Sequence, residues 1–129
     1  MIYIIRHGKT ELNKAKVLQG RSDFPLNEEG VRQAEAVAAR IGEVTFAHVY
    51  SSPLIRAVQT AEIIAPQVKP VIDERLIEMD YGPYEGTDLT HLSPESQGRY
   101  WSKYIGNCAI YIATNADGRI GVPYELSKL

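Results

Sequence analysis

The residues best suited to chemistry in this 129-residue chain are Arg6, His7 and Gly8, which directly follow an apolar run at residues 1–5. An imidazole beside a guanidinium can bind an anion and attack it, and a glycine lets a bound anion approach the backbone closely. Ligands of open α/β sheets lie off the carboxyl ends of the strands. We therefore expect this strand end to face a crevice and to handle phosphate.

Composition and charge indicate one soluble globular domain that binds a small anion. The chain has 44% hydrophobic and 23% charged residues and a net charge of −2. This is enough for an ordinary core, and it gives no bulk attraction for nucleic acid or an anionic membrane. The single cysteine, Cys108, excludes an intrachain disulfide. Because the N-terminus has a strand pattern instead of a signal-type core and no stretch is long enough to span a membrane, we expect a cytoplasmic protein.

Strand-like and helix-like blocks alternate along the chain, which predicts an α/β fold with three α/β/α layers and a mostly parallel central sheet. Strands are expected at residues 1–5 and 48–51, with a polar loop at 14–26. Asn27 is the expected N-cap of a helix that Gly42 ends, and Pro53 and Pro66 bound a second helix. The buried face expected for the first helix is Val31, Ala34, Val37, Ala38 and Ile41. The buried face expected for the second is Leu54, Ala57, Val58, Ala61 and Ile64.

Two further charged residues are interpreted from their positions. Arg56 falls in the first turn of the second helix, where a cation opposes the helix dipole by roughly 0.3 to 1 kcal/mol unless an anion is held there. Considered alone, Arg56 could also be an exposed arginine whose charge is screened. Glu78 precedes a turn-rich aromatic loop at residues 79–86, which could wall a pocket, although an isolated glutamate is more often simply solvated.

Four co-linear segments closely resemble motifs of the histidine phosphatase (phosphoglycerate mutase-like) superfamily over residues 1 to about 90. They are residues 6–13, Gln19-Gly20, residues 51–57, and residues 75–78 with Tyr81-Gly82. One Arg-His-Gly triplet would be weak evidence, but four motifs on suitable elements are hard to obtain by chance. The resemblance implies a single domain over residues 1–129, shortened relative to the family, with residues 105–129 as a C-terminal hairpin.

The resemblance also implies a role for each matching residue. His7 resembles the nucleophile that takes the phosphoryl group, and Glu78 the general acid and base. The residues implied to bind phosphate or substrate are Arg6, Gly8, Asn13, Gln19, Gly20, Arg56 and Tyr81.

General chemistry supports these roles. Imidazole attacks only when neutral, and neighbouring guanidinium groups favour that form by charge repulsion. A carboxyl group kept partly protonated beside the aromatic loop could protonate the leaving alkoxide and then activate water. Two arginines and backbone amides supply charge stabilisation for phosphoryl transfer, so we expect neither a metal nor another cofactor.

One part of the superfamily pattern is absent. Relatives carry a second histidine in a His-Gly motif at the end of a later core strand beside the first strand, and we infer that this segment is missing between about residues 92 and 104. His91 has no strand before it and no glycine after it, and His48 starts a strand far from its active end, so we place neither in the pocket. We expect the strand at residues 108–114 or a second copy of the chain to fill the position, giving an altered sheet and, in the latter case, a homodimer.

We interpret the chain as a phosphatase that hydrolyses a phosphate monoester, from a small metabolite or a phosphoprotein, through a phosphohistidine on His7. Losing one preorganised donor typically costs on the order of 10² to 10³ in rate, so we expect activity to survive weakly. The alternatives are a phosphate-binding regulatory relative with weak or no turnover and a shortened product without independent function. A phosphoglycerate-type mutase is disfavoured, because no run of basic residues follows Gly86 to hold a bisphosphorylated substrate.

Overall fold

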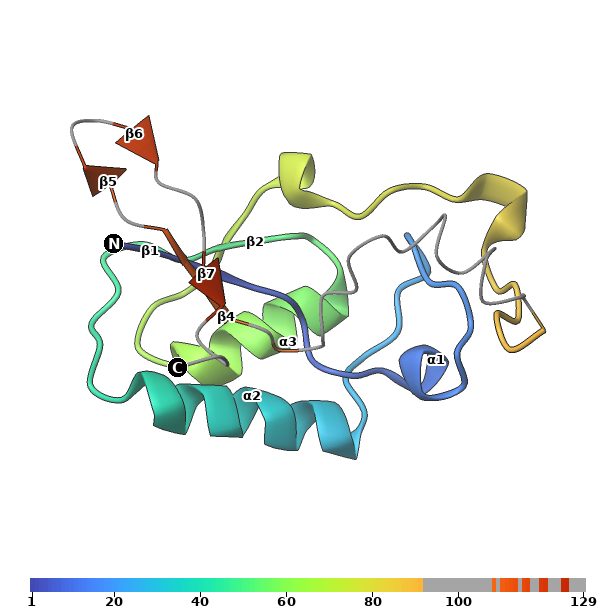
Figure 1. The fold of residues 1–129 in the computed structure, drawn as a ribbon, viewed down its shortest axis with the longest axis horizontal. Coiled ribbons are helices and arrows are strands. Elements are labelled where there is room, and N and C mark those ends of the chain that lie inside the picture. Colours follow the sequence, from blue (N-terminus) through green and yellow to red (C-terminus); the bar gives the residue numbers. More distant parts are fainter. Residues whose placement is uncertain (92–107, 109, 114, 117–118, 121–123, 126–129) are drawn as a thin grey trace.

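Strands and helices alternate in the computed structural model as the sequence predicts (Figure 1). The structure describes residues 1–91, 108, 110–113, 115–116, 119–120 and 124–125. The helical elements are α1 (Glu11–Lys14), α2 (Glu28–Ile41), α3 (Ile55–Ile64) and two 3-10 turns, η1 (Glu74–Leu76) and η2 (Gly82–Tyr84). The strands are β1 (Ile2–Ile5), β2 (Tyr50–Ser51), β3 (Val71–Ile72), β4 (Ile110–Ala113), β5 (Asn115–Ala116), β6 (Arg119–Ile120) and β7 (Tyr124–Glu125).

Helix α2 begins and ends where its capping residues predict. The side-chain oxygen of Asn27 accepts a hydrogen bond from the Gly30 amide at 2.8 Å. Gly42 ends the helix with a φ of 69°, a left-handed conformation that favours glycine. Within the predicted apolar face, Ala34 and Val37 are buried, and Tyr3 and Ile5 of β1 pack against the cluster that they form. This contact fixes β1, and the site at its end, over α2.

Helix α3 packs against α2 (Figure 1), and its most buried positions include two polar residues. Its buried residues are Arg56 and Thr60. Of the face expected from the sequence, Leu54 is buried, while Ala57, Val58, Ala61 and Ile64 are half-buried. The polar Arg56 and Thr60 are buried as well, because they bond to neighbouring backbone groups and so occupy the interior at little desolvation cost.

The fold is α/β, as expected, but its described strands do not form one mostly parallel sheet. Strand β1 pairs with β4 in antiparallel register from Ile2 with Ala113 to Ile5 with Ile110, and β4 pairs with β7. Strands β2 and β3 form a separate parallel pair, and β5 and β6 an antiparallel one. Strand β4, the described part of the strand expected at residues 108–114, therefore lies beside β1, as one of the two expectations had it. A homodimer stays a prediction that sedimentation velocity can test.

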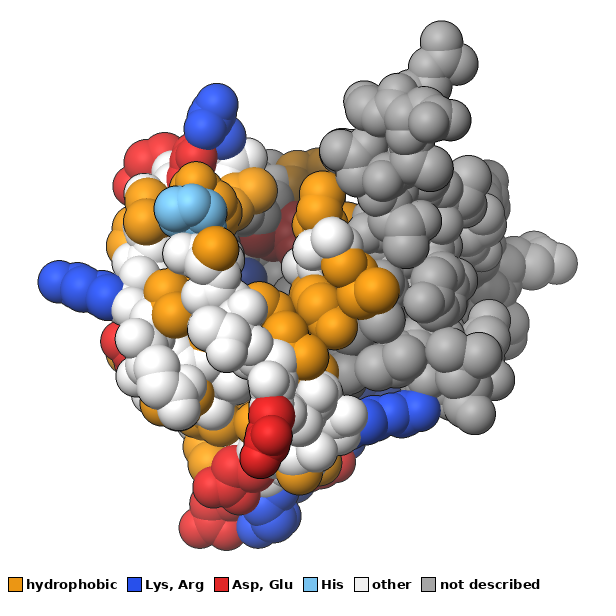
Figure 2. Space-filling model, turned by 90° about the vertical axis from the view of Figure 1, so that its left-hand side faces the viewer, with side chains coloured by type: hydrophobic (Ala, Val, Ile, Leu, Met, Phe, Trp, Pro, Cys, Tyr) orange, Lys and Arg blue, Asp and Glu red, His pale blue; other side chains and the backbone are white. Residues whose placement is uncertain are grey.

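Apolar residues are exposed on both of the first two sheets. Ile2 and Ile4 of β1 are 42% and 50% exposed, and Tyr50 of β2 is 59% exposed. On the side of the molecule shown in Figure 2, hydrophobic side chains border a hollow. Among the described residues, β1 pairs with no strand except β4, and β2 with none except β3. Strands β1 and β2 are therefore both edge strands among the described residues, and the single sheet that the sequence predicted is divided.

The structure gives little information on two predictions, the missing segment and the location of the protein. The inferred gap between about residues 92 and 104 lies outside the described residues. In the described part of the chain, no helix is long and apolar enough to cross a membrane.

Candidate active site

The imidazole of His7 lies just beyond β1 with both ring nitrogens in defined contacts. Its Nδ1 lies 2.7 Å from the carbonyl oxygen of Gly8. Because a carbonyl can only accept, Nδ1 carries the proton and Nε2 keeps its lone pair. That Nε2 accepts a hydrogen bond from Nε of Arg56 at 3.2 Å. The backbone thus selects the tautomer in which Nε2 carries the lone pair.

The environment of His7 also keeps the ring neutral. Its pKa is lowered from 6.5 to about 4, chiefly because burial penalises the charged form. The hydrogen bond to Gly8 raises the pKa, and repulsion by Arg56 and Arg6 lowers it further. The two arginines therefore lower the pKa of His7 as predicted, but burial lowers it more. At pH 7 the ring of His7 is therefore neutral.

The guanidinium of Arg56 is held by a loop that precedes α2. Its Nη2 donates to the carbonyl oxygen of Gly20 at 2.6 Å, and its Nη1 to that of Ser22 at 2.8 Å. Arg56 is only 2% exposed, so the alternative of a screened surface arginine is wrong. At the same helix start, the carboxylate of Asp23 accepts the Ile55 amide at 2.7 Å, which supplies the negative charge that favours a helix N-terminus.

Gly8 is buried between two helices and not open to the solvent. Its amide donates to the hydroxyl oxygen of Thr60 at 3.1 Å, and that hydroxyl donates to the Arg56 carbonyl at 2.7 Å. A side chain at Gly8 would run into the backbone of Gly30 in α2. The glycine is therefore required for the close approach of the loop to α2, and its role in binding an anion stays a prediction.

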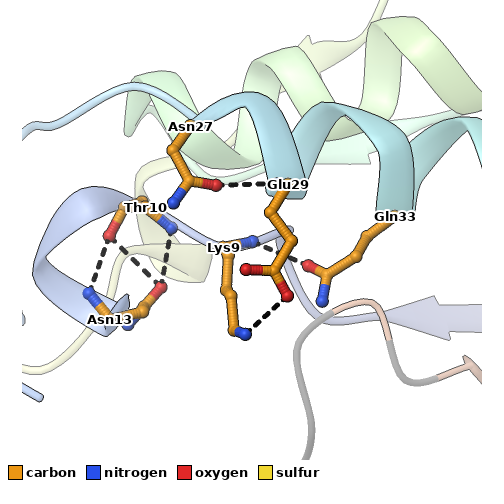
Figure 3. A network of polar contacts seen from close by, with 7 residues as sticks. Lys9, Thr10, Asn13, Asn27, Glu29 and Gln33 are labelled. Atoms are coloured by element: carbon orange, nitrogen blue, oxygen red, sulfur yellow. Dashed lines mark hydrogen bonds and ion pairs between the residues drawn. The ribbon is translucent and has the colours of Figure 1, made fainter. Parts of the chain in front are cut away.

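The loop after His7 is tied to the start of α2 by Lys9 (Figure 3). The Lys9 amide donates to Oε1 of Gln33 at 3.0 Å, and its ammonium lies 2.6 Å from Oε1 of Glu29. The Lys9 carbonyl accepts the Asn27 amide at 2.9 Å. These contacts use the side chain and both backbone groups of Lys9, so they fix the position of the preceding His7.

Asn13 and Gln19, both predicted to bind substrate, converge on the buried Thr10. The side-chain oxygen of Asn13 accepts from the Thr10 amide at 3.1 Å, in the capping box of α1 (Figure 3). The Thr10 hydroxyl lies 2.7 Å from Oε1 of Gln19. Both side chains therefore order the segment around Thr10, which follows His7 in the chain. A direct contact of either with phosphate stays a prediction.

Glu78 and Tyr81 lie beside residues 20 and 21: Nε of Arg21 donates to the Glu78 carbonyl at 3.2 Å, and the Tyr81 ring lies next to Gly20. Glu78 is exposed, and its Oε1 accepts the Met79 amide at 2.7 Å, so the aromatic loop does not shield this carboxyl from solvent. Its charge nevertheless reaches the site: burial lowers the pKa of Arg56, and Glu78 is the first of the acidic groups that oppose this. The pKa of Tyr81 is raised by burial and then by the charges of Glu78 and Glu85.

The remaining histidines and the cysteine are placed as follows. His91 is exposed, with Nε2 3.5 Å from a carboxylate oxygen of Asp88, and His48 is exposed beside Tyr50. The expectation that neither enters the pocket stays a prediction. Cys108 is buried, which raises its pKa to about 11, and its amide donates to the His7 carbonyl at 3.2 Å. This bond joins the C-terminal segment to the site.

The structure brings His7 and Arg56 into direct contact, and the Gly20 carbonyl accepts a hydrogen bond from the Arg56 guanidinium. Arg6 is close enough to lower the pKa of His7. Comparison with protein families gives a match over residues 2–119 to the histidine phosphatase superfamily, branch 1. The chain belongs to the histidine phosphatase superfamily. This confirms the resemblance that the motifs at residues 6–13, 19–20, 51–57 and 75–82 suggested.

Similar superfamily members are longer than this chain. A probable phosphoglycerate mutase GpmB of Proteus mirabilis is 40% identical over 121 residues, which are 92% of this chain and 53% of that protein. One from Yersinia pestis is 42% identical over 108 residues, 82% of this chain and 49% of its own length. The chain thus spans about half the length of the curated relatives it matches, which agrees with the inference that a superfamily segment is absent.

Solved structures support the same histidine phosphatase fold. The phosphoserine phosphatase of Entamoeba histolytica, in complex with 3-phosphoglyceric acid, is 36% identical with a TM-score of 0.65 over 78% of this chain and 51% of that one. A mutant of a phosphoserine phosphatase from the same organism, in complex with phosphoserine, gives a TM-score of 0.75 at 23% identity, over 96% of this chain and 93% of that one. The second likeness shows the fold alone.

Sequence reasoning missed three residues that order the site: Thr60, Ser22 and Glu85. Thr60 lies one helical turn after Arg56, so the spacing could have placed it on the same face. Ser22 binds Arg56 through its backbone carbonyl oxygen, and such a contact cannot be predicted from the residue type. Glu85 is close to the site because a loop folds back, and no local pattern encodes that contact.

Proposed function

We propose that this histidine phosphatase superfamily member hydrolyses a small phosphate monoester through a phosphohistidine on His7. The observation that carries the proposal is the neutral imidazole whose Nδ1 proton is engaged by the Gly8 carbonyl while Nε2 faces the guanidinium of Arg56. A nucleophilic nitrogen beside a cation suits attack on a phosphorus that bears negatively charged oxygens. The cytoplasmic location and the absence of nucleic-acid or membrane partners belong to the same proposal.

In the first step, Nε2 of His7 attacks phosphorus and a nitrogen–phosphorus bond forms while the bond to the ester oxygen breaks. Arg56 and Arg6 stabilise the negative charge on the equatorial oxygens. The leaving alkoxide takes a proton from the carboxyl of Glu78. The products of this step are phosphohistidine, a free alcohol and the Glu78 carboxylate.

In the second step, water attacks phosphorus, and the nitrogen–phosphorus bond breaks. The Glu78 carboxylate takes a proton from the water, so the acid of the first step is the base of the second. Inorganic phosphate leaves, and His7 returns with its lone pair on Nε2. In a mutase, a second alcohol or phosphoryl acceptor would replace water, and this variant is the weaker proposal.

The exposure of Glu78 favours one alternative, a phosphate-binding regulatory protein with little turnover. The Glu78 carboxyl is exposed and hydrogen-bonded to its own neighbouring amide, so it is not enclosed in the way that general-acid catalysis favours. Such a protein would use Arg6 and Arg56 to bind a phosphorylated small molecule or phosphoprotein. It would do so without completing the reaction.

Turnover of p-nitrophenyl phosphate, phosphoserine and 3-phosphoglycerate across mildly acidic to neutral pH tests the proposal. We expect phosphate release that is lost in His7→Ala and kept in His48→Ala, a matched change of an exposed histidine. Glu78→Gln should slow the reaction by roughly 10². Turnover that persists in His7→Ala would refute the phosphatase. Saturable phosphate binding without turnover would favour the regulatory alternative.

A further inference from the structure

The carboxylate of Glu85 is bound by the loop at residues 20–22. The amide of Gly20 donates to Oε2 at 3.1 Å, the amide of Arg21 to Oε1 at 2.8 Å, and the hydroxyl of Ser22 to Oε2 at 2.5 Å. Desolvation of this carboxyl raises its pKa, but the hydrogen bonds from Ser22 and from the loop amides outweigh that effect and lower the pKa to about 2. Glu85 is therefore ionised whenever the protein is folded near neutral pH.

The opposite side of the same loop binds the guanidinium of Arg56. While the amides of the loop turn toward Glu85, the carbonyl oxygens of Gly20 and Ser22 accept from Nη2 and Nη1 of Arg56. One three-residue loop thus separates a carboxylate from a guanidinium and bonds to both. The negative charge of Glu85 also opposes the effect of burial on the pKa of Arg56.

Close packing makes the loop a rigid connection. A side chain at Gly20 would run into the Glu85 carboxylate, the Met79 carbonyl and the ring of Tyr81. The side-chain amide of Gln19 also donates to the Ser22 carbonyl at 3.3 Å. A shift of Glu85 would therefore move the carbonyl oxygens that orient Arg56.

Arg56 in turn contacts the proposed nucleophile, since its Nε donates to Nε2 of His7 at 3.2 Å. Three successive contacts link the Glu85 carboxylate to the nucleophilic nitrogen: carboxylate to loop amides, loop carbonyls to guanidinium, and guanidinium to imidazole. We propose that Glu85 is a positioning residue, which fixes Arg56 through the loop at residues 20–22 and thereby sets both the anion affinity of the site and the protonation of His7. Its link to catalysis rests on the proposed function, but its effects on His7 and on anion binding do not.

The test compares Glu85→Gln with Asp73→Asn, a control at a carboxylate whose pKa is also about 2 but whose hydrogen bonds go to Arg75. An amide in place of the carboxylate puts a donor against the donors of the loop, so Arg56 should lose its orientation. We expect the pKa of His7, followed by nitrogen-15 NMR, to rise by about one unit in Glu85→Gln. The dissociation constant for orthovanadate should rise roughly tenfold. Asp73→Asn should change neither.

A folded Glu85→Gln protein with unchanged His7 pKa and unchanged vanadate affinity would overturn the proposal, even if its melting temperature fell. If Glu85→Gln does not fold, Ser22→Ala removes a single bond to the carboxylate and should shift both quantities in the same direction by a smaller amount. Ser22→Ala without any shift would then overturn it. If the wild type binds vanadate and the shifts occur but no ester is hydrolysed, the proposed function fails and the positioning role stands. If hydrolysis occurs, kcat in Glu85→Gln should fall more than KM rises.

Discussion

Acidification from pH 7 to pH 5 should destabilise this protein through His7. The pKa of His7 is 6.5 in an unfolded chain and about 4 in the fold. The unfolded state therefore binds more protons between these values, and stability is lost as pH falls through 6.5 toward 4. Above and below this window the contribution of His7 does not change with pH.

The magnitude follows from the two pKa values. With 6.5 unfolded and about 4 folded, lowering the pH from 7 to 5 removes about 2 kcal/mol of unfolding free energy. That is a large part of the roughly 5 to 15 kcal/mol that holds a small domain together. Glu85, whose pKa falls from 4.5 to about 2, loses its stabilising contribution only below about pH 4.5 and does not interfere.

Urea unfolding at pH 7 and pH 5 measures this difference. We expect the wild type to lose about 2 kcal/mol more than His7→Gln over that interval, because glutamine has no titrating ring. His48→Gln, a change at an exposed histidine, should retain the wild-type loss. An equal loss in wild type and His7→Gln would show that the imidazole is not held neutral, and the reasoning about the site would be wrong.

Three further outcomes follow from the same contacts. Phosphorylation of His7 in a single turnover should lose rate only as pH falls toward about 4, the pKa of the folded ring; an acid limb near 6.5 would argue against a buried neutral nucleophile. Arg56→Lys should weaken orthovanadate binding at least tenfold, because an ammonium cannot replace a fork that binds two carbonyls and the imidazole; isothermal titration showing wild-type affinity would contradict this. Gly30→Ala should lower the unfolding free energy by about 1 to 3 kcal/mol, since its methyl group would meet the Lys9 backbone, and unchanged urea unfolding would refute that close contact.

The sequence predicted the elements that carry strong local signals. Asn27 and Gly42 bound α2 because capping depends on residues adjacent in the chain. The Arg-His-Gly triplet and Arg56 were recognised because the superfamily keeps them in fixed motifs. Those signals identified His7, the proposed nucleophile, and Arg56, whose guanidinium the structure places against it.

Other features depend on contacts between distant segments and could not be predicted locally. Glu85 binds a loop 63 to 65 residues earlier in the chain, through the amides of Gly20 and Arg21 and the hydroxyl of Ser22. Arg56 and Thr60 are buried because backbone groups satisfy them, against the rule that apolar residues line a helix interior. The division into separate sheets likewise depends on which strands are present to pair. The pairing partner of a strand cannot be predicted from the sequence of that strand alone.

The central claim is that His7 carries the phosphoryl group on Nε2. Phosphorus-31 NMR of the wild type, trapped by acid-free denaturation during turnover of p-nitrophenyl phosphate, tests it directly. We expect a phosphoramidate signal that is labile to acid, stable to alkali and absent in His7→Ala, with attachment at Nε2. Hydrolysis without any such signal, or with the phosphoryl group on another residue, would contradict the account.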